Sequence, residues 1–269
     1  MHDPGPAFRA LHQPGNPFVL ANAWDVGSAK VLAALGAQAL GTSSAGYAFT
    51  LGKPDGSLTR DEALAHAQSI VEATALPVSA DLENGYGDDP ETVAETVRMA
   101  GEIGLAGVSI EDTLLPGATA YDFDLAVERI RAAVAAARSL KRDFVLVARA
   151  DGIMLHGYDI EEALRRLKAF EAAGADCLYA PLPESFEDLE RIVTETVTPV
   201  NALATGSFAS YTQEDFARIG IARISLGSSL ARVTQRALID AVEEIFDDGS
   251  FSRLKKSVPG ELIDKMLGD

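Results

Sequence analysis

Eight short apolar runs, separated by helical stretches, recur along the chain and constrain its fold more than any other feature. They cover residues 18–23, 39–42, 78–81, 107–110, 144–150, 177–179, 200–203 and 223–226. Most of these runs lack an alternation of apolar and polar residues, which is typical of parallel strands covered on both faces. In a chain of 269 residues this repetition predicts an α/β fold of the (β/α)8 TIM-barrel type. A doubly wound open sheet is the alternative.

The stretches between the runs carry clear signals of helix starts. Thr59 and Glu62 form a capping-box pattern, and Asp89 followed by Pro90 marks the start of another helix. Glycine follows several of the helical patterns, where a left-handed C-terminal cap favours it. Because no linker or low-complexity segment divides the chain, we expect one barrel domain over residues 1–269.

Residues 250–269 form a predicted helical extension beyond the eight units of the barrel. A helix over 230–246 follows the last strand, a polar turn occupies 247–250, and the segment 259–267 is amphipathic. The apolar residues of this extension are too many for a free tail and must be buried. Surplus helices of this kind pack on their own barrel or on that of a neighbouring subunit.

The composition excludes some classes of partner. Acidic residues number 40 against 23 basic ones, and the net charge of −17 argues against nucleic acid or an anionic membrane. No apolar run is long enough to span a membrane. The single cysteine, Cys177, fits a reducing compartment, and residues 1–6 lack the pattern of a signal peptide. We therefore expect a cytoplasmic protein.

Two carboxylate pairs stand where short apolar runs end, Asp81 with Glu83 and Glu111 with Asp112. In barrels of this type the chemistry gathers at the C-terminal ends of the strands. Unpaired carboxylates at such positions repel one another and resist desolvation unless a cation neutralises them. Oxygen-only clusters without His or Cys suit Mg²⁺ or Mn²⁺ rather than zinc. Asp55, in the loop after the second run, offers a further acid.

Other polar residues at the strand ends allow two interpretations each. Arg149, among the acids, is either a structural counter-ion or a bidentate clamp for a substrate carboxylate. Ser43 and Ser44 either offer backbone N–H groups to an oxyanion or pack tightly at a strand end. Trp24, the only tryptophan, either walls the pocket or belongs to the core.

Taken together, these residues resemble the isocitrate lyase/phosphoenolpyruvate mutase superfamily along essentially the whole chain. The matching motifs are Gly41-Thr42-Ser43-Ser44, Lys53-Pro54-Asp55, Asp81-Leu82-Glu83-Asn84-Gly85-Tyr86-Gly87, Ile110-Glu111-Asp112 and Val147-Ala148-Arg149-Ala150-Asp151. The resemblance implies a (β/α)8 barrel that binds 2-oxo acids or their enolates beside Mg²⁺. It also implies terminal helices exchanged between the subunits of a dimer, and tetramers built from such dimers.

The resemblance also assigns roles to individual residues. It implies a metal site surrounded by Asp55, Asp81, Glu83 and Glu111, partly through water, with Mn²⁺ as an alternative to Mg²⁺. It implies that Arg149 binds a substrate carboxylate and that Ser43 and Ser44 contact the oxo-acid end. We expect Trp24 and Asp81 to complete the substrate site. For catalysis we expect Arg149, Glu111 and Tyr47 to act on the substrate, while Tyr121 and His156 are alternatives to Tyr47 as the proton donor.

Two departures from the superfamily pattern reduce the number of reactions that the chain is expected to catalyse. The loop 113–123 has no Cys, Lys or His, whereas isocitrate and methylisocitrate lyases carry a cysteine motif there. Pro181 stands near the position of a second lyase glutamate. We therefore predict a Mg²⁺-dependent lyase or decarboxylase of a small 2-oxo or 2-hydroxy di- or tricarboxylic acid, acting through an enolate. The alternatives are a 2-oxo acid binding protein with little activity and a weak isocitrate or methylisocitrate lyase.

Overall fold

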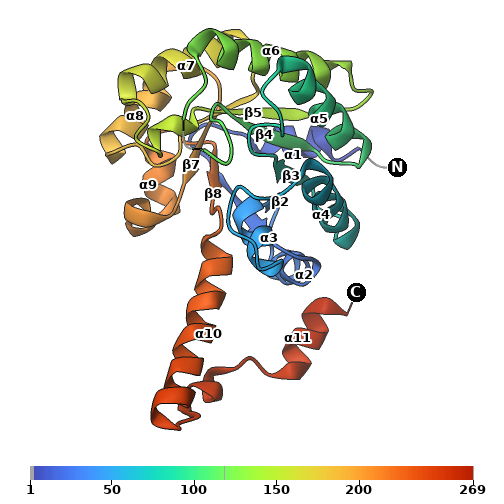
Figure 1. Ribbon diagram of the computed structural model, residues 1–269, viewed down its shortest axis with the longest axis vertical. Helices are drawn as coiled ribbons and strands as arrows, with labels where there is room; N and C mark the ends of the chain where they lie inside the picture. The colour runs from blue at the N-terminus through green and yellow to red at the C-terminus, as the bar shows by residue number, and fades with distance from the viewer. Residues whose placement is uncertain (1–2, 118, 269) are drawn as a thin grey trace.

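The centre of the protein, in the computed structural model that describes residues 3–117 and 119–268, is a closed barrel of parallel strands (Figure 1). The strands are β1 (Phe18–Ala23), β2 (Leu40–Thr42), β3 (Val78–Asp81), β4 (Gly107–Glu111), β5 (Val145–Arg149), β6 (Cys177–Tyr179), β7 (Val200–Leu203) and β8 (Arg223–Ser225). Each strand pairs with the next, and β8 pairs with β1. All eight predicted runs form strands whose ends differ by at most one residue from the prediction. The predicted barrel is confirmed, and the open sheet is excluded.

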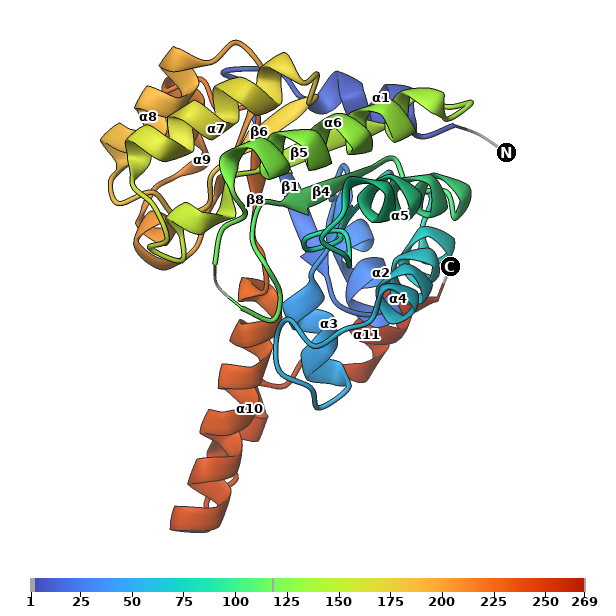
Figure 2. The ribbon, with the colours of Figure 1, turned by 45° about the horizontal axis from the view of Figure 1, so that its top comes forward.

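Helices cover the outside of the barrel, as Figures 1 and 2 show from two directions. Thr59 and Glu62 form the predicted capping box of one of them, and Asp89 and Asp159 each cap another through a backbone N–H three residues on. The helices are α1 (Gly5–Leu11), α2 (Val26–Ala34), α3 (Ser44–Thr50), α4 (Arg60–Ala73), α5 (Pro90–Glu102), α6 (Phe123–Ser139), α7 (Ile160–Ala172), α8 (Phe186–Glu195), α9 (Gln213–Arg218), α10 (Ser229–Asp248) and α11 (Gly260–Leu267), with short 3-10 turns η1 (Asp151–Ile153), η2 (Gly206–Ser210) and η3 (Ser252–Lys256).

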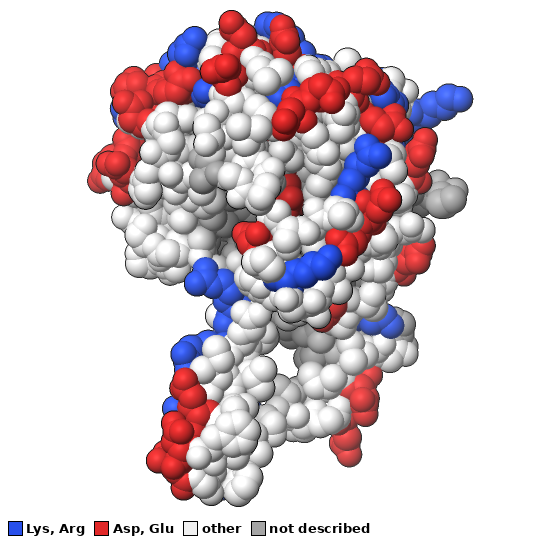
Figure 3. Space-filling view, viewed as in Figure 1, with Lys and Arg blue, Asp and Glu red and all other residues white. Residues whose placement is uncertain are grey.

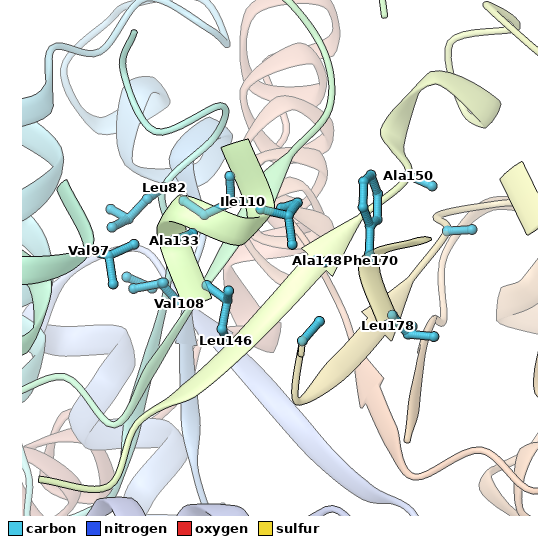
Figure 4. Packing of buried hydrophobic residues seen from close by; sticks show 14 of the residues in the cluster. Leu82, Val97, Val108, Ile110, Ala133, Leu146, Ala148, Ala150, Phe170 and Leu178 are labelled. Carbon is cyan, nitrogen blue, oxygen red and sulfur yellow. The ribbon is translucent and has the colours of Figure 1, made fainter. Parts of the chain in front are cut away.

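The main hydrophobic core lies between the strands and the helices around them. Val108 and Ile110 of β4 are fully buried in this layer, where they belong to one cluster with Val97 of α5 and Phe170 of α7 (Figure 4). Because side chains alternate along a strand, the residues that follow them face the barrel interior instead. This alternation is what turns Glu111 toward the inside.

The N-terminal end of the barrel is filled by an element that the sequence did not predict. Helix α1 places Phe8, which is fully buried, in a second cluster with Phe18, Val145 and Val147 near the starts of the strands. The segment is rich in proline and glycine, which hides its helical character, although proline is well tolerated in a first helical turn. Helix α1 therefore seals the end of the barrel opposite to the predicted site.

The predicted C-terminal extension is helical, and it follows a helix that points away from the barrel. Helix α10 projects away from it, and α11 returns to pack against α2 of the same chain (Figures 1 and 2). The Lys30 ammonium donates to the carbonyl of Leu267 at 3.0 Å across this contact. In the space-filling view the charged side chains gather on the outer edge of α10, and its flank toward α11 is uncharged (Figure 3). The exposed large apolar residues of this region are Val233, Leu238, Ile239, Phe246, Phe251, Leu254, Val258 and Leu262.

Among the described residues, no helix is both long and apolar enough to cross a membrane. The longest, α10, carries both acidic and basic side chains along its length.

We predict that α1 is an integral part of the barrel. Replacing the buried Phe8 by Ala should lower the free energy of unfolding by about 3–5 kcal/mol, because the substitution leaves a cavity at the barrel floor. Urea unfolding at a fixed protein concentration measures this loss. Val197→Ala, at a side chain that is 90% exposed, is the control and should stay within about 0.5 kcal/mol of the wild type. Equal stability of the Phe8 variant and the control would contradict this role of α1.

Candidate active site

A cavity of about 490 Å³ opens at the C-terminal ends of the barrel strands. This is a size suited to a small ligand, and the position is the usual one for the active site of such barrels. Its lining brings together seven of the residues predicted from the sequence, namely Ser43, Ser44, Asp55, Asp81, Glu83, Glu111 and Arg149. These come from four consecutive strands and the loops that follow them.

Arg149 is the centre of the charge network in this cavity. Its Nη1 contacts Asp81 Oδ1 at 3.0 Å and Glu111 Oε1 at 2.7 Å, and its Nη2 contacts Asp151 Oδ1 at 2.5 Å. Strand register explains part of this, because Glu111 of β4 is the direct partner of Arg149 on β5. The three carboxylates hold the pKa of the buried guanidinium well above its usual range, despite the opposing effect of burial. Without a ligand, Arg149 therefore acts as a counter-ion.

Asp81 is held from its other side by the start of helix α3, which occupies residues expected from the sequence to lie at a strand end. The hydroxyl of Ser44 donates to Asp81 Oδ2 at 3.0 Å, and the backbone N–H of Ser44 lies 3.4 Å from the same oxygen. Ser43 caps α3 by accepting from the backbone N–H of Gly46 at 3.1 Å. The Ser43–Ser44 step thus presents donors to an anion, and in this structure the anion is Asp81.

The remaining acids are poorly neutralised. Burial, followed by the charges of Asp81 and Asp55, raises the pKa of Glu83 to about 8. Glu83 is only 4% exposed, and its Oε1 has no hydrogen-bond partner among the described residues. Burial also raises the pKa of Glu111 well above its usual range, although Arg149 opposes the shift. The pKa of Asp55 is raised by partial burial and by the charge of Asp81. The acids at the mouth of the cavity therefore have too little positive charge around them.

The donor set fits a divalent cation of a particular kind. Among the described residues, no three Asp, Glu, His or Cys side chains come close enough together to hold a metal ion unaided. Mg²⁺, however, usually keeps several waters and needs only one or two carboxylates. The oxygen-only lining, the raised pKa values and the unpartnered Oε1 of Glu83 suit such a hydrated ion. Asp55, Asp81, Glu83 and Glu111 are the residues that could hold it.

Asp112, the neighbour of Glu111, faces away from the cavity. Its Oδ1 accepts from the backbone N–H of Asp151 at 2.7 Å, and its Oδ2 accepts from Tyr158 at 2.8 Å and from Arg166 at 2.9 Å. Consecutive strand residues point to opposite faces, so the alternation along β4 could have predicted this separation. Asp112 positions the backbone of Asp151, which in turn pairs with Arg149.

Four predicted residues do not line the cavity. The ring of Tyr47 stacks on His66 with centroids 3.9 Å apart, and the carbonyl of Trp24 lies 3.1 Å from His66 Nε2. The hydroxyl of Tyr121 donates to Asp88 Oδ1 at 2.7 Å, and His156 is exposed after η1. None of the three predicted proton donors thus reaches the cavity in this structure.

Sequence reasoning missed several residues that do line the cavity. The loop after β4 contributes Leu115, Pro116 and Gly117, which form an apolar wall, and the polar Thr113 beside them. The barrel interior contributes a polar set that lies on strand positions facing inward, namely Asn22, Ser79, Ser109, Tyr179, Arg223 and Ser225. Once the alternation of each strand is known, polar residues at inward positions of an otherwise apolar run are the signal that could have found this set.

Comparison with known proteins agrees with this geometry. The family model of phosphoenolpyruvate phosphomutase matches residues 8–246. A provisionally assigned lyase/mutase from Burkholderia cenocepacia J2315 has a crystal structure similar to this one, with a TM-score of 0.94 and 42% identity over 99% of this chain and 96% of that chain. The 2-methylisocitrate lyase of Salmonella typhimurium is 32% identical over 251 residues, 88% of this chain and 83% of that protein. The oxaloacetate decarboxylase of Paraburkholderia xenovorans is 37% identical over 191 residues, 67% of this chain and 62% of that protein.

The barrel and its acid-lined mouth define an enzyme of the lyase or mutase type. The chain belongs to the phosphoenolpyruvate mutase/isocitrate lyase superfamily, and the resemblance inferred from its motifs is confirmed.

We predict that Glu83 makes stability depend on pH in the metal-free protein. Because its native pKa of about 8 lies above the ordinary value of 4.5, the native state keeps a proton that the unfolded chain loses between these values. Stability should therefore fall as the pH rises through this window, by at most about 1.4 kcal/mol per pH unit from this group. Glu83→Gln should remove that part of the slope.

Thermal unfolding in the presence of a chelator, at several pH values between these limits, measures the effect. Glu190→Gln, at an exposed position of α8, is the matched control and should follow the wild type at every pH. Parallel curves for wild type and Glu83→Gln would show that Glu83 titrates normally in the folded protein.

Proposed function

We propose that this chain is a Mg²⁺-dependent carbon–carbon lyase or decarboxylase of a small 2-oxo or 2-hydroxy di- or tricarboxylic acid, and that the reaction passes through an enolate. The observation that carries the proposal is the ring of acids around Arg149 at the mouth of a superfamily barrel. The named relatives support it, because they are a lyase of a tricarboxylic acid and a decarboxylase of an oxo diacid.

The acids of the mouth would hold the metal. Asp81 and Glu111 would contact it directly or through water, and Glu83 and Asp55, which line the same cavity, would surround it. When bound, Mg²⁺ would supply positive charge beside the 2-oxo group and so favour the enolate. Mn²⁺ could replace it, since both ions prefer oxygen ligands.

Arg149 would exchange partners when the substrate arrives. Its Nη1 now serves both Asp81 and Glu111, and a cation near those acids would release it. The planar guanidinium can then hold a substrate carboxylate through two parallel hydrogen bonds. Ser44, whose N–H and hydroxyl now face Asp81, could turn the same donors toward the oxo-acid end.

A second candidate function follows from the residues around the reacting bond. The loop wall of Leu115, Pro116 and Gly117 can exclude water but carries no acid or base. The predicted donors Tyr47, Tyr121 and His156 lie away from the cavity. These placements favour a 2-oxo acid binding protein with little activity over an efficient isocitrate lyase.

We also propose that the protein works as a homo-oligomer. Helix α10 exposes Leu238, Ile239 and Phe246, and η3 adds Leu254, so that a long apolar flank faces solvent in the single chain. A second copy of the chain would bury this flank, as the resemblance to a superfamily that assembles through its terminal helices implies. Tetramers built from such dimers are the expected assembly.

Turnover and binding of the same acids decide between the two candidate functions. The panel comprises oxaloacetate, 2-methylisocitrate, isocitrate and 2,3-dimethylmalate, each tested with Mg²⁺ and with Mn²⁺ by following substrate loss. The lyase proposal expects turnover of at least one acid and its loss on adding a chelator. Binding without turnover would establish the binding protein instead. An absence of both would overturn the two together.

We predict that Asp81→Ala abolishes Mg²⁺ binding measured by calorimetry, because it removes the acid shared by Arg149 and the start of α3. Asp124→Ala, an exposed acid of the first turn of α6, is the control and should bind Mg²⁺ like the wild type. Unchanged affinity in the Asp81 variant would remove Asp81 from the metal site.

We predict that Arg149→Lys weakens binding of a 2-oxo diacid by about 1–3 kcal/mol, because a point charge cannot replace a bidentate fork. Calorimetry with oxaloacetate in the presence of Mg²⁺ measures the change. The matched control is Arg165→Lys, at an arginine of α7 that pairs with Glu162 away from the cavity. Equal affinity in the Arg149 variant would leave Arg149 as a structural counter-ion alone.

We predict that ending the chain at Asp248 lowers the assembly state and the thermal stability together. The truncation removes η3 and α11, which pack against α10 and α2 respectively. Light scattering and thermal unfolding measure the two effects. If the full-length protein is a monomer at micromolar concentration, the oligomer proposal is wrong.

A further inference from the structure

A second arginine lies deep inside the barrel, below the mouth of the cavity. Arg223 begins β8, where its strand neighbours are Phe18 and Asn201. It is only 4% exposed, yet it belongs to the lining of the cavity. Its Nε and Nη1 are buried and have no hydrogen-bond partner among the described residues.

The other deeply buried arginines differ from Arg223 in that their terminal nitrogens are paired, although Nε of Arg129 and Nε of Arg149 also lack partners among the described residues. Arg129 uses both terminal nitrogens on backbone carbonyl groups of the loop after β3. Arg166 pairs with Asp112 and with the carbonyl of Tyr121, and Arg149 pairs with three carboxylates. The chain thus supplies partners for terminal nitrogens of each of these arginines, and it supplies none for Arg223 Nη1.

An unpaired buried charge is costly, so Arg223 requires an explanation. The effective cost of burying one ion is several kcal/mol, and arginine cannot avoid it by losing its proton. Burial lowers the pKa of Arg223, but the side chain remains a cation. Packing alone would be better served by an apolar side chain of similar volume.

The floor around Arg223 is polar where such barrels are normally filled by branched apolar residues. Asn201 donates to the Ser225 hydroxyl at 2.9 Å, while Asn201 Oδ1 and the hydroxyl of Ser79 have no partners among the described residues. Ser79 and Ser225 also line the cavity. The cavity is therefore acidic at its mouth and carries a free cation at its floor.

We propose that Arg223 forms an anion-binding subsite at the floor of the cavity and holds a second carboxylate of the ligand, so that the site selects acids with at least two carboxylates. This inference rests on the proposed function, because it assumes that a small acid occupies the cavity. Arg149 is already engaged by three acids, whereas the donors of Arg223 are free for a ligand. Arg223 would thus determine specificity, while the bond chemistry stays at the mouth.

Succinate and butyrate test the proposal, because the two acids have the same carbon chain and differ in one carboxylate. We expect the wild type, measured by calorimetry with Mg²⁺, to bind succinate more tightly than butyrate. Arg223→Gln should lose about ten- to hundredfold in succinate affinity with little change for butyrate, in line with a hydrogen bond to a charged group. Arg223→Lys should recover part of the preference. Equal succinate affinity in the wild type and Arg223→Gln would overturn the proposal, as would a wild type without any preference.

Thermal stability separates this role from a structural one. If Arg223 serves a ligand, Arg223→Gln should unfold at the same temperature as the wild type or higher, because an unpaired buried charge is removed. Arg166→Gln is the contrasting variant and should unfold at a lower temperature, since it leaves Asp112 buried without its cation. A lower unfolding temperature for Arg223→Gln, with the succinate preference kept, would make Arg223 a structural residue.

The same variants separate this inference from the proposed function. Loss of the succinate preference in Arg223→Gln, in a protein that turns over no oxo acid, would support the subsite and defeat the lyase proposal. Turnover of an oxo diacid with the same kcat/KM in the wild type and Arg223→Gln would support the lyase and overturn the subsite.

Discussion

The charge balance around Arg149 is the interaction on which the rest of the site depends. One guanidinium, at the end of β5, neutralises Asp81 and Glu111 at the ends of the two preceding strands and Asp151 in the turn after β5. A second buried ion pair, between Asp112 and Arg166, fixes the backbone of Asp151 from the helix layer. Removing one member of such a network leaves the others as unpaired buried charges, a loss that typically costs about 3–5 kcal/mol.

The network neutralises the acids only in part, and the remaining negative charge favours the binding of a cation. Glu83 and Glu111 keep raised pKa values, so the metal-free cavity favours protons on its carboxylates. A divalent cation would displace those protons and would free Arg149 for a substrate carboxylate. At the floor, Arg223 presents a positive charge that no described residue neutralises. The cavity thus combines acids that need a cation with a cation that needs an anion, which suits joint binding of a metal and a diacid.

Much of this arrangement was predictable from the sequence, and the failures have physical causes. Apolar runs without alternation predicted every strand, and acids at the ends of those runs predicted the mouth of the cavity. Both features can be recognised from short stretches of neighbouring residues. Helix α1 was missed because Pro4 and Gly5 disguise it, and its stability comes from packing Phe8 into the barrel. The roles of Asp112 and Arg223 depend on which face of a strand each side chain takes. The face that each side chain takes can be assigned only when the register of the barrel strands is known.

The coupling between metal and acid tests the central claim most directly. Calorimetry would measure the affinity of succinate with and without Mg²⁺, and that of Mg²⁺ with and without succinate. If Mg²⁺ binds the carboxylates that now pair with Arg149, the guanidinium becomes available to succinate. Mg²⁺ should then raise the affinity for succinate, and succinate the affinity for Mg²⁺, by the same factor of about 5- to 150-fold. Affinities that do not change when the other ligand is present would contradict the account. They would mean that metal binding to the acids does not release Arg149 for the substrate carboxylate.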